Sequence, residues 1–226
     1  MPRLVTANQF YTELITDNIR GATGGIVFNL KNINVTVNSK DSIGHMLQDW
    51  LEAWAVSKDI YIRGNPATQS FPDFYLSQSS EDNLLEIKSF DYSASPNFDI
   101  ANFETYVRAL SENPKKLDAS YLIFGYTLNN GQLIIKDVWI KKIWEISTSS
   151  NNWSLKLQVK QGTIYNIRPA TFTSTRSNIA QPFANKLLFL EAIQDVLNNY
   201  PKTSGLQTSW LANFKIYYQT ATGVSL

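Results

Sequence analysis

Hydrophobic residues recur along much of the chain at the spacing of amphipathic helices. In several windows they return every three or four positions, so that one helical face can pack against a core. Two windows open with a polar residue suited to the N-cap, Thr6 in one and Asp99 in the other. The predicted helices cover residues 6–20, 42–57, 99–111 and 183–199.

Shorter stretches are aromatic, β-branched or alternating, which is the pattern of β-strands. The turn Asn129-Asn130-Gly131 joins two of them and predicts a hairpin. The aromatic segment Trp210–Tyr218 is expected to be a closing strand or a dimer contact. The other predicted strands cover residues 26–30, 33–37, 59–63, 71–76, 84–90, 120–128, 132–140, 153–160 and 163–167.

This order of strands and helices predicts an α/β fold, with a mixed central β-sheet flanked by helices. The chain has 226 residues, which suits one large domain. No internal repeat, low-complexity tract or convincing linker interrupts it. We therefore expect a single domain over residues 1–226.

One predicted hairpin brings charged side chains together. Its strands, 71–76 and 84–90, flank an entirely polar turn, residues 77–83. Pairing about the Ser79–Ser80 peptide places Asp73 directly opposite Glu86. Because side chains alternate between faces, Glu86 and Lys88 share one face. Two carboxylates and one ammonium would then converge at an edge of the sheet.

Such a cluster has a chemical use. Two acids supply the hard oxygen ligands that Mg²⁺ prefers, and the ion keeps several waters that can meet a phosphate substrate. A lysine beside the site can orient a water, help deprotonate it or balance charge in the transition state. The alternative is structural: Glu86 and Lys88 form a solvent-facing pair on an edge strand, and Asp73 merely starts a strand.

Composition limits the choices further. The net charge of +1 gives no global basic field that would indicate a nucleic-acid partner. The chain has no cysteine, which excludes disulfides, zinc-thiolate sites and cysteine nucleophiles, and its single histidine, His45, excludes a multi-histidine metal site. The start lacks the apolar region of a signal peptide and no apolar run reaches membrane-spanning length, so we expect a cytoplasmic protein.

The motif Pro72-Asp73 followed by Glu86-Ile87-Lys88 resembles the PD-(D/E)XK nuclease superfamily, and the whole outline resembles a type II restriction endonuclease. The resemblance implies that Asp73 and Glu86 hold Mg²⁺, one or two ions per site, and that Lys88 acts on the attacking water. It also implies a catalytic role for Gln48. Many such enzymes carry a Gly-x-x-x-(Glu/Gln) helix, matched here by Gly44 and Gln48, although glutamate is commoner than glutamine. Asp49 is the neighbouring candidate for the metal site, and the alternative for both residues is a solvated helix face.

The same resemblance suggests where DNA would bind. The loop that leads into Pro72 would lie beside the scissile phosphate and offers three candidate contacts: Arg63, Asn65 and Gln69. Residues 168–178 are rich in hydroxyls, hold two arginines and contain no acid, which suits the reading of base edges. The candidates there are Arg168, Ser174, Arg176 and Asn178. In both segments the alternative is an ordinary polar loop.

The expected activity is hydrolysis of double-stranded DNA by a homodimer at a short palindrome, because a two-fold protein matches a two-fold site. A weaker similarity points to interrupted sites such as GGNNCC, and a cognate DNA methyltransferase is expected in the same system. Two alternatives stay open. One is a repair or junction nuclease of the same superfamily, and the other is a non-catalytic binding domain for DNA or protein.

Overall fold

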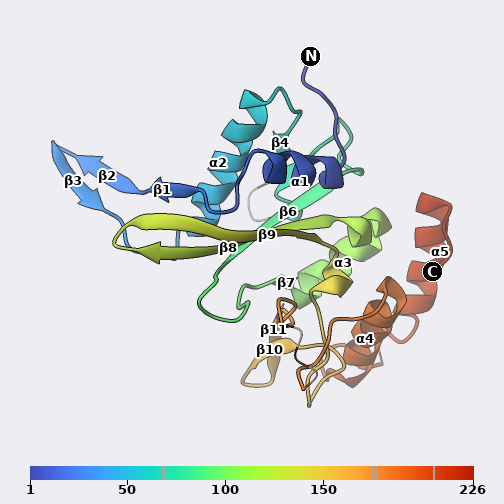
Figure 1. Ribbon diagram of the computed structural model, residues 1–226. Helices are drawn as coiled ribbons and strands as arrows, with labels where there is room; N and C mark the ends of the chain where they lie inside the picture. Colours follow the sequence, from blue (N-terminus) through green and yellow to red (C-terminus); the bar gives the residue numbers. More distant parts are fainter. Residues whose placement is uncertain (68–69, 175, 177, 206) are drawn as a thin grey trace. The chain divides into compact units, whose positions relative to one another are not determined.

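The computed structural model describes residues 1–67, 70–174, 176, 178–205 and 207–226. Contacts within this part of the chain group it into two compact units (Figure 1). The first unit comprises Met1–Ser95 and Ser120–Lys141, and the second comprises Pro96–Ala119 and Lys142–Leu226. Each unit is therefore built from two separate segments of the chain. The single domain over residues 1–226 stays a prediction.

A mixed sheet with strand order β1-β9-β8-β6-β5-β4 forms the centre of the first unit. β6 and β8 are parallel, and every other neighbouring pair in this sheet is antiparallel. This confirms the predicted mixed sheet, although β6 lies inside it rather than at its edge. The strands are β1 (Thr23–Gly25), β4 (Arg63–Gly64), β5 (Phe74–Tyr75), β6 (Leu84–Asp91), β8 (Ser120–Asn129) and β9 (Gln132–Lys141).

Helices α1 (Ala7–Thr16) and α2 (Ile43–Ser57) supply apolar side chains to the core beside this sheet. The predicted cap of α1 is confirmed, because the Thr6 hydroxyl accepts a hydrogen bond from the Gln9 amide at 3.2 Å. The Gln9 side chain accepts one in return from the Thr6 amide at 2.8 Å, completing a capping box. Buried members of this core are Phe10, Leu14, Leu51, Trp54, Ile87, Leu122, Phe124 and Val138.

A separate hairpin joins α1 and α2 through β1. Its strands, β2 (Val27–Leu30) and β3 (Ile33–Thr36), pair only with each other among the described residues. In Figure 1 this hairpin extends beyond the end of the central sheet, at the left of the view. Both strands were predicted, but every residue in them is exposed.

The second unit combines helices with a small antiparallel sheet of order β10-β11-β7. One polar network ties its distant segments together, since Lys186 Nζ donates to Asp118 Oδ1 at 2.9 Å and Tyr218 donates to the same carboxylate at 2.5 Å. The elements are β7 (Ala101–Asn102), α3 (Phe103–Glu112), η1 (Pro114–Asp118), η2 (Ile143–Glu145), β10 (Leu157–Lys160), β11 (Thr163–Ile167), α4 (Lys186–Asn199) and α5 (Trp210–Thr222).

Several predicted boundaries were wrong. Asn102 rather than Asp99 caps α3, because the Asn102 side chain accepts from the Thr105 amide at 3.0 Å while Asp99 pairs with Arg168. The segment from Trp210 is helix α5, whose Trp210, Phe214 and Tyr218 follow helical spacing and are buried. The strand predicted over 59–63 is reduced to a single bridge at Ile60 and the start of β4.

Other elements are shorter than predicted. α1 ends at Thr16 instead of 20, α4 begins at Lys186 instead of 183, and β10 covers only the last part of 153–160. None of the helices that the structure describes is both long and apolar enough to cross a membrane.

Candidate active site

The hairpin that carries Asp73, Glu86 and Lys88 has the predicted register. Phe74 lies opposite Leu85 and Tyr75 lies opposite Leu84, while the Leu76 amide donates to the Asn83 carbonyl at 3.0 Å. Continued by one residue, this register sets Asp73 against Glu86. The polar turn between the strands therefore folds the two acids back onto each other, as the sequence indicated.

Asp73 and Glu86 are held by reciprocal hydrogen bonds across the strands. The Ile87 amide donates to Asp73 Oδ2 at 2.8 Å, and the Asp73 amide donates to Glu86 Oε2 at 3.1 Å. Lys88 Nζ lies 2.9 Å from Glu86 Oε1. Glu86 is only 7% exposed, and the other two side chains are half-buried. All three candidate catalytic groups thus form one cluster on β6 and at the start of β5.

Helix α2 completes the cluster from the side. The Gln48 amide lowers the pKa of the Asp73 carboxyl as a hydrogen-bonding group, and His45 lowers it more weakly through electrostatic interaction. Residues three positions apart share one helical face, which explains why both influence the pKa of the same acid. The sequence favoured Gln48 through its position on the helix. His45 was not predicted to act here, and only its i−3 spacing from Gln48 could have indicated it.

Burial dominates the electrostatics of both acids. Burial and, to a smaller extent, nearby Asp73 raise the pKa of Glu86 to about 7, against the opposing effects of Lys88 and the Asp73 amide. Burial likewise raises the pKa of Asp73 above its ordinary value, against the Ile87 amide, Lys88, Gln48 and His45. Two carboxylates therefore share a partly dehydrated site in which one lysine does not fully balance them.

The cluster suits a small divalent cation. Its donors are carboxylate oxygens and an amide side chain, which are hard ligands, and a cation would favour the ionised forms that burial opposes. No group of three or more His, Cys, Asp or Glu gathers at a potential metal site in the described part of the chain. An ion here would be coordinated by Asp73 and Glu86 and would keep several waters, as Mg²⁺ does in phosphate-transfer sites.

Comparison with known proteins identifies the family of the chain. The model of the NgoBV restriction endonuclease family matches residues 4–226. The chain belongs to this family. It is 36% identical over 218 residues to the type II restriction enzyme NlaIV of Neisseria lactamica, covering 95% of this chain and 90% of that protein.

A second relative and a solved structure extend the match. The type II restriction enzyme NgoBV of Neisseria gonorrhoeae is 34% identical over 160 residues, covering 70% of this chain and 91% of that protein. The structure of the NlaIV restriction endonuclease superposes with a TM-score of 0.93 at 35% identity, covering 99% of this chain and 92% of that one. The chain is thus a type II restriction endonuclease, and the predicted fold and enzyme class are confirmed.

In this endonuclease, two of the candidate DNA contacts flank the acid cluster. The Arg63 guanidinium lies 4.4 Å from the centre of the Tyr75 ring and donates to Ser80 Oγ at 3.0 Å. Asn65 Nδ2 donates to the Pro72 carbonyl at 2.9 Å, so it also shapes the loop that carries Asp73. Gln69 lies outside the described residues. The structure brings Arg63 and Asn65 to the strands of the site.

The other candidate contacts belong to the second unit. Arg168 is engaged within the chain, pairing with Asp99 and donating to the Asn97 carbonyl. Arg176 and Asn178 are exposed, and the Arg176 amide donates to Ser174 Oγ at 3.3 Å. Arg168 therefore fixes the start of the polar loop, while the two exposed side chains are available to a ligand.

Replacing Gln48 with alanine tests the contribution of α2. The substitution removes a hydrogen bond that favours ionised Asp73, so we expect about 10-fold weaker binding of the divalent cation. The measurement is the cation concentration that gives half-maximal cleavage. Asp49→Ala is the matched control, because Asp49 is exposed and adjacent on the same helix. Equal cation requirements in the two variants would contradict a role for Gln48.

Proposed function

We propose that this endonuclease hydrolyses double-stranded DNA with Mg²⁺ at the Asp73–Glu86–Lys88 cluster, in the manner of the PD-(D/E)XK nucleases. The observation that carries the proposal is the pairing of a buried and a half-buried carboxylate with one ammonium across a single hairpin. A purely structural pair on an edge strand would not need a buried Glu86, and β6 is an interior strand.

Asp73 and Glu86 are the residues that would hold the cation, and Lys88 is placed beside them to act on water. When bound, Mg²⁺ would stabilise charge on the phosphate and make a bound water more acidic. The Ile87 amide fixes the Asp73 carboxylate, and Gln48 supports it from α2. Lys88, at 2.9 Å from Glu86, holds a positive charge where a water or a scissile phosphate would lie.

The reaction is an in-line displacement at phosphorus. A water loses a proton and its oxygen forms the new bond to phosphorus, while the bond between phosphorus and the 3′-oxygen breaks. The leaving 3′-oxygen takes up a proton. The products are a 5′-phosphate and a 3′-hydroxyl. Either one or two Mg²⁺ ions per site could balance the negative charge of the two acids and the phosphate.

The proposed substrate is a short palindrome cut in both strands by a homodimer. GGNNCC is the target that follows from the resemblance in the sequence. The match to NlaIV over nearly the whole chain supports assigning both proteins to one group of restriction endonucleases. A methyltransferase of matching specificity is expected beside it, because a host must protect its own sites.

DNA contacts are proposed for two parts of the chain. Arg63 and Asn65, next to the loop that carries Asp73, are suited to the backbone near the scissile phosphate. Gln69 is proposed for the same loop from sequence alone. In the second unit Arg176 and Asn178 have the side chains that pair with guanine and adenine, with Ser174 beside them and Arg168 as the anchor of the loop.

A plasmid with one GGNNCC site gives the direct test. We expect a single linear product with Mg²⁺ and none after chelation by EDTA, because the two acids need a cation to accept a phosphate. An otherwise identical plasmid without the site should stay uncut. Fragments from a different sequence would reject GGNNCC alone. Cleavage only at branched DNA favours a junction nuclease, and no metal-dependent cleavage of any DNA would refute the catalytic proposal.

A further inference from the structure

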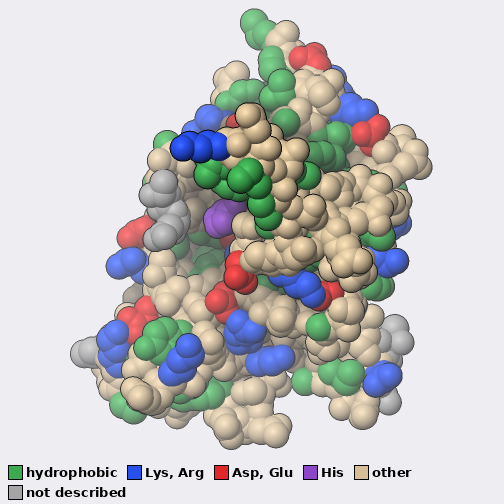
Figure 2. Space-filling model, turned by 90° about the vertical axis from the view of Figure 1, so that its left-hand side faces the viewer, with side chains coloured by type: hydrophobic (Ala, Val, Ile, Leu, Met, Phe, Trp, Pro, Cys, Tyr) green, Lys and Arg blue, Asp and Glu red, His purple; other side chains and the backbone are tan. Residues whose placement is uncertain are grey.

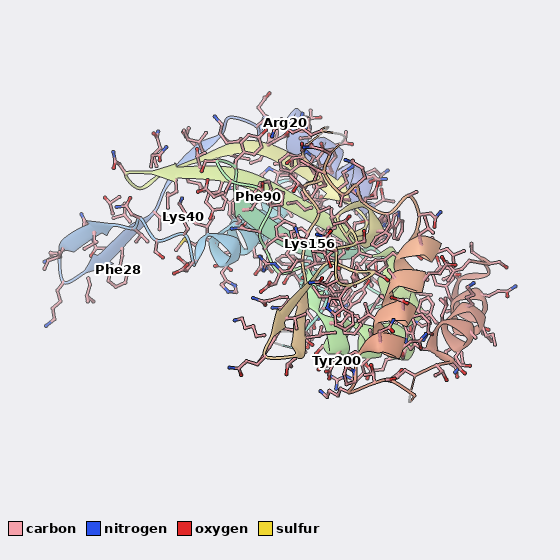
Figure 3. The ribbon with its side chains drawn as sticks, turned by 90° about the horizontal axis from the view of Figure 1, so that it is seen from below. Arg20, Phe28, Lys40, Phe90, Lys156 and Tyr200 are labelled. Carbon is pink, nitrogen blue, oxygen red and sulfur yellow. The ribbon has the colours of Figure 1, made fainter. Side chains whose placement is uncertain are left out.

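The hairpin β2–β3 has one entirely apolar face. Phe28 pairs with Val35 and Leu30 pairs with Ile33, and residues directly opposite each other in an antiparallel pair point to the same side. All four side chains are exposed: 56% for Phe28, 51% for Val35, 61% for Leu30 and 66% for Ile33. Figure 3 labels Phe28 at this end of the molecule, well away from Phe90 on β6. These four residues are called the hairpin patch below.

The opposite face of the hairpin is different in kind. Asn29 Nδ2 donates to Asn34 Oδ1 at 2.6 Å, so this cross-strand pair is polar and satisfied. Lys31 and Asn32 form the turn with φ values of 48° and 64°, which is the left-handed geometry of a tight two-residue hairpin. β3 alternates strictly between apolar and polar residues, whereas β2 also carries the exposed Val27 on the Asn29 side, opposite Thr36. Apart from Val27, this is the pattern of a strand pair that is buried on one face only.

An isolated two-stranded hairpin is marginally stable in water, so an exposed apolar patch of this kind indicates a surface that another molecule buries. Four large side chains with roughly 100 Å² exposed each give about 400 Å², which is within the range of patches that mark interaction sites. A standard interface takes about 800 Å² from each partner. The hairpin patch alone would therefore supply about half of one side of an interface.

The apolar surface continues at the root of the hairpin. A hollow of about 230 Å³ opens there between β1, α2 and β9, lined by apolar side chains that include Ile26, Met46, Trp50 and Leu133. Trp50 is 40% exposed although it belongs to the apolar stripe of α2. Ile26 directly precedes β2, so the hollow and the hairpin patch adjoin along the chain. Figure 2 views the molecule from this side.

The charges in this region argue against DNA as the cover. Residues 26–37 contain one charged side chain, Lys31, whereas phosphate contacts need several cations. In an isologous interface, in contrast, the same surface patch is present on both partners by symmetry, so an apolar patch meets an apolar patch. One chain carries both the projecting patch and the adjoining hollow, and a second copy would bring the same pair.

We propose that the hairpin patch is an interface between two copies of this chain. The inference rests on the proposed homodimer and names the surface that forms it. Two hairpin patches and the adjoining apolar surface would be buried together, leaving the acid cluster on β5 and β6 of each copy outside the interface. The hairpin then has a reason to be apolar on one face, and its cover is the partner's surface.

The double variant Phe28→Ser/Ile33→Ser tests the proposal by sedimentation velocity. Wild-type protein should sediment as a dimer at micromolar concentration, and the variant should dimerise at least about 100-fold more weakly, as expected when central apolar contacts are lost. Val56→Ser is the control, because Val56 is 68% exposed on α2 and its loss removes a similar exposed side chain. A cooperative thermal transition would show that the variant folds, and its melting temperature should be lower only by the stability that the dimer contributes.

A labelling experiment gives a second measurement, in which dilution rather than a disruptive substitution separates the two copies. Because the chain has no cysteine, a Val35→Cys variant carries one thiol for reaction with a maleimide. We expect labelling at least about 10-fold slower above the dimer dissociation constant than below it. Val56→Cys should react equally fast at both concentrations. Equal reactivity of Val35→Cys at both concentrations would overturn the proposal.

The outcomes separate this inference from the proposed function. A wild-type monomer, or a Phe28→Ser/Ile33→Ser variant that remains dimeric, overturns the interface even if the enzyme cuts DNA. A variant that stays dimeric but loses DNA affinity assigns the hairpin patch to DNA instead. Failure of the wild-type protein to cleave any DNA with Mg²⁺ removes the proposed function and leaves the sedimentation result to decide the interface on its own.

Discussion

Lys88→Ala and Asp73→Ala should each lower the rate of DNA cleavage by at least about 10³-fold while leaving DNA binding nearly unchanged. Asp73 would lose the carboxylate that the Ile87 amide holds at 2.8 Å. Lys88→Ala removes the positive charge from beside Glu86 and, because Lys88 opposes the rise in the pKa of Glu86, leaves that acid harder to ionise. Neither change removes a candidate DNA contact.

Single-turnover cleavage and gel-shift binding in Ca²⁺ or EDTA separate the two effects. Lys136→Ala is the matched control for Lys88→Ala, because Lys136 is an exposed lysine on β9 of the same sheet. The control should cut at the wild-type rate. Full activity of either Lys88→Ala or Asp73→Ala would end the assignment of the cluster as the active site.

Glu86→Gln should abolish cleavage and, in metal-free buffer, stabilise the folded protein above pH 7. The pKa of Glu86 is raised to about 7 in the folded state from an ordinary value of 4.5. Its contribution to stability is thus fully present below pH 4.5 and is lost as pH rises through 7, because ionisation then favours the unfolded chain. The difference corresponds to about 3 kcal/mol, and this net shift already includes the favourable Lys88 pair.

Thermal unfolding in EDTA between pH 5 and pH 8.5 measures this effect. Wild-type protein should lose stability across the interval relative to Glu86→Gln, so that the variant melts several degrees higher at pH 8. Glu52→Gln, a change at an exposed carboxylate on α2, is the control and should follow the wild type. Parallel melting curves for Glu86→Gln and wild-type protein at all pH values would contradict a buried, strained carboxylate at this position.

The local parts of the site could be predicted because their geometry is short-range. A polar turn fixes which residues of its two strands face each other, and strand alternation fixes which side chains share a face. Those two rules were enough to set Asp73 against Glu86 and to place Lys88 beside it. The Asn129-Asn130-Gly131 turn and the Thr6 cap were equally predictable, since each depends on residues within a few positions of one another.

Long-range contacts decided what the sequence left open. Asp99 has a side chain suited to a helix cap, but it forms a salt bridge with Arg168. Asn102 caps α3 instead. The segment from Trp210 is aromatic enough for a strand, yet its apolar residues are buried at helical spacing within the second unit. Neither outcome follows from local propensity, because tertiary packing overrides differences of this size.

The sequence by itself therefore determined the hairpin that carries two acids and a lysine, and the existence of the two short strands between α1 and α2. Only the tertiary structure decided that Gln48 and His45 influence the pKa of Asp73, that Glu86 is buried deeply enough to resist ionisation, and that one apolar hairpin face is left open to solvent. The physical reason is that pairing within a hairpin depends on neighbours along the chain, whereas burial depends on every element that packs around a residue.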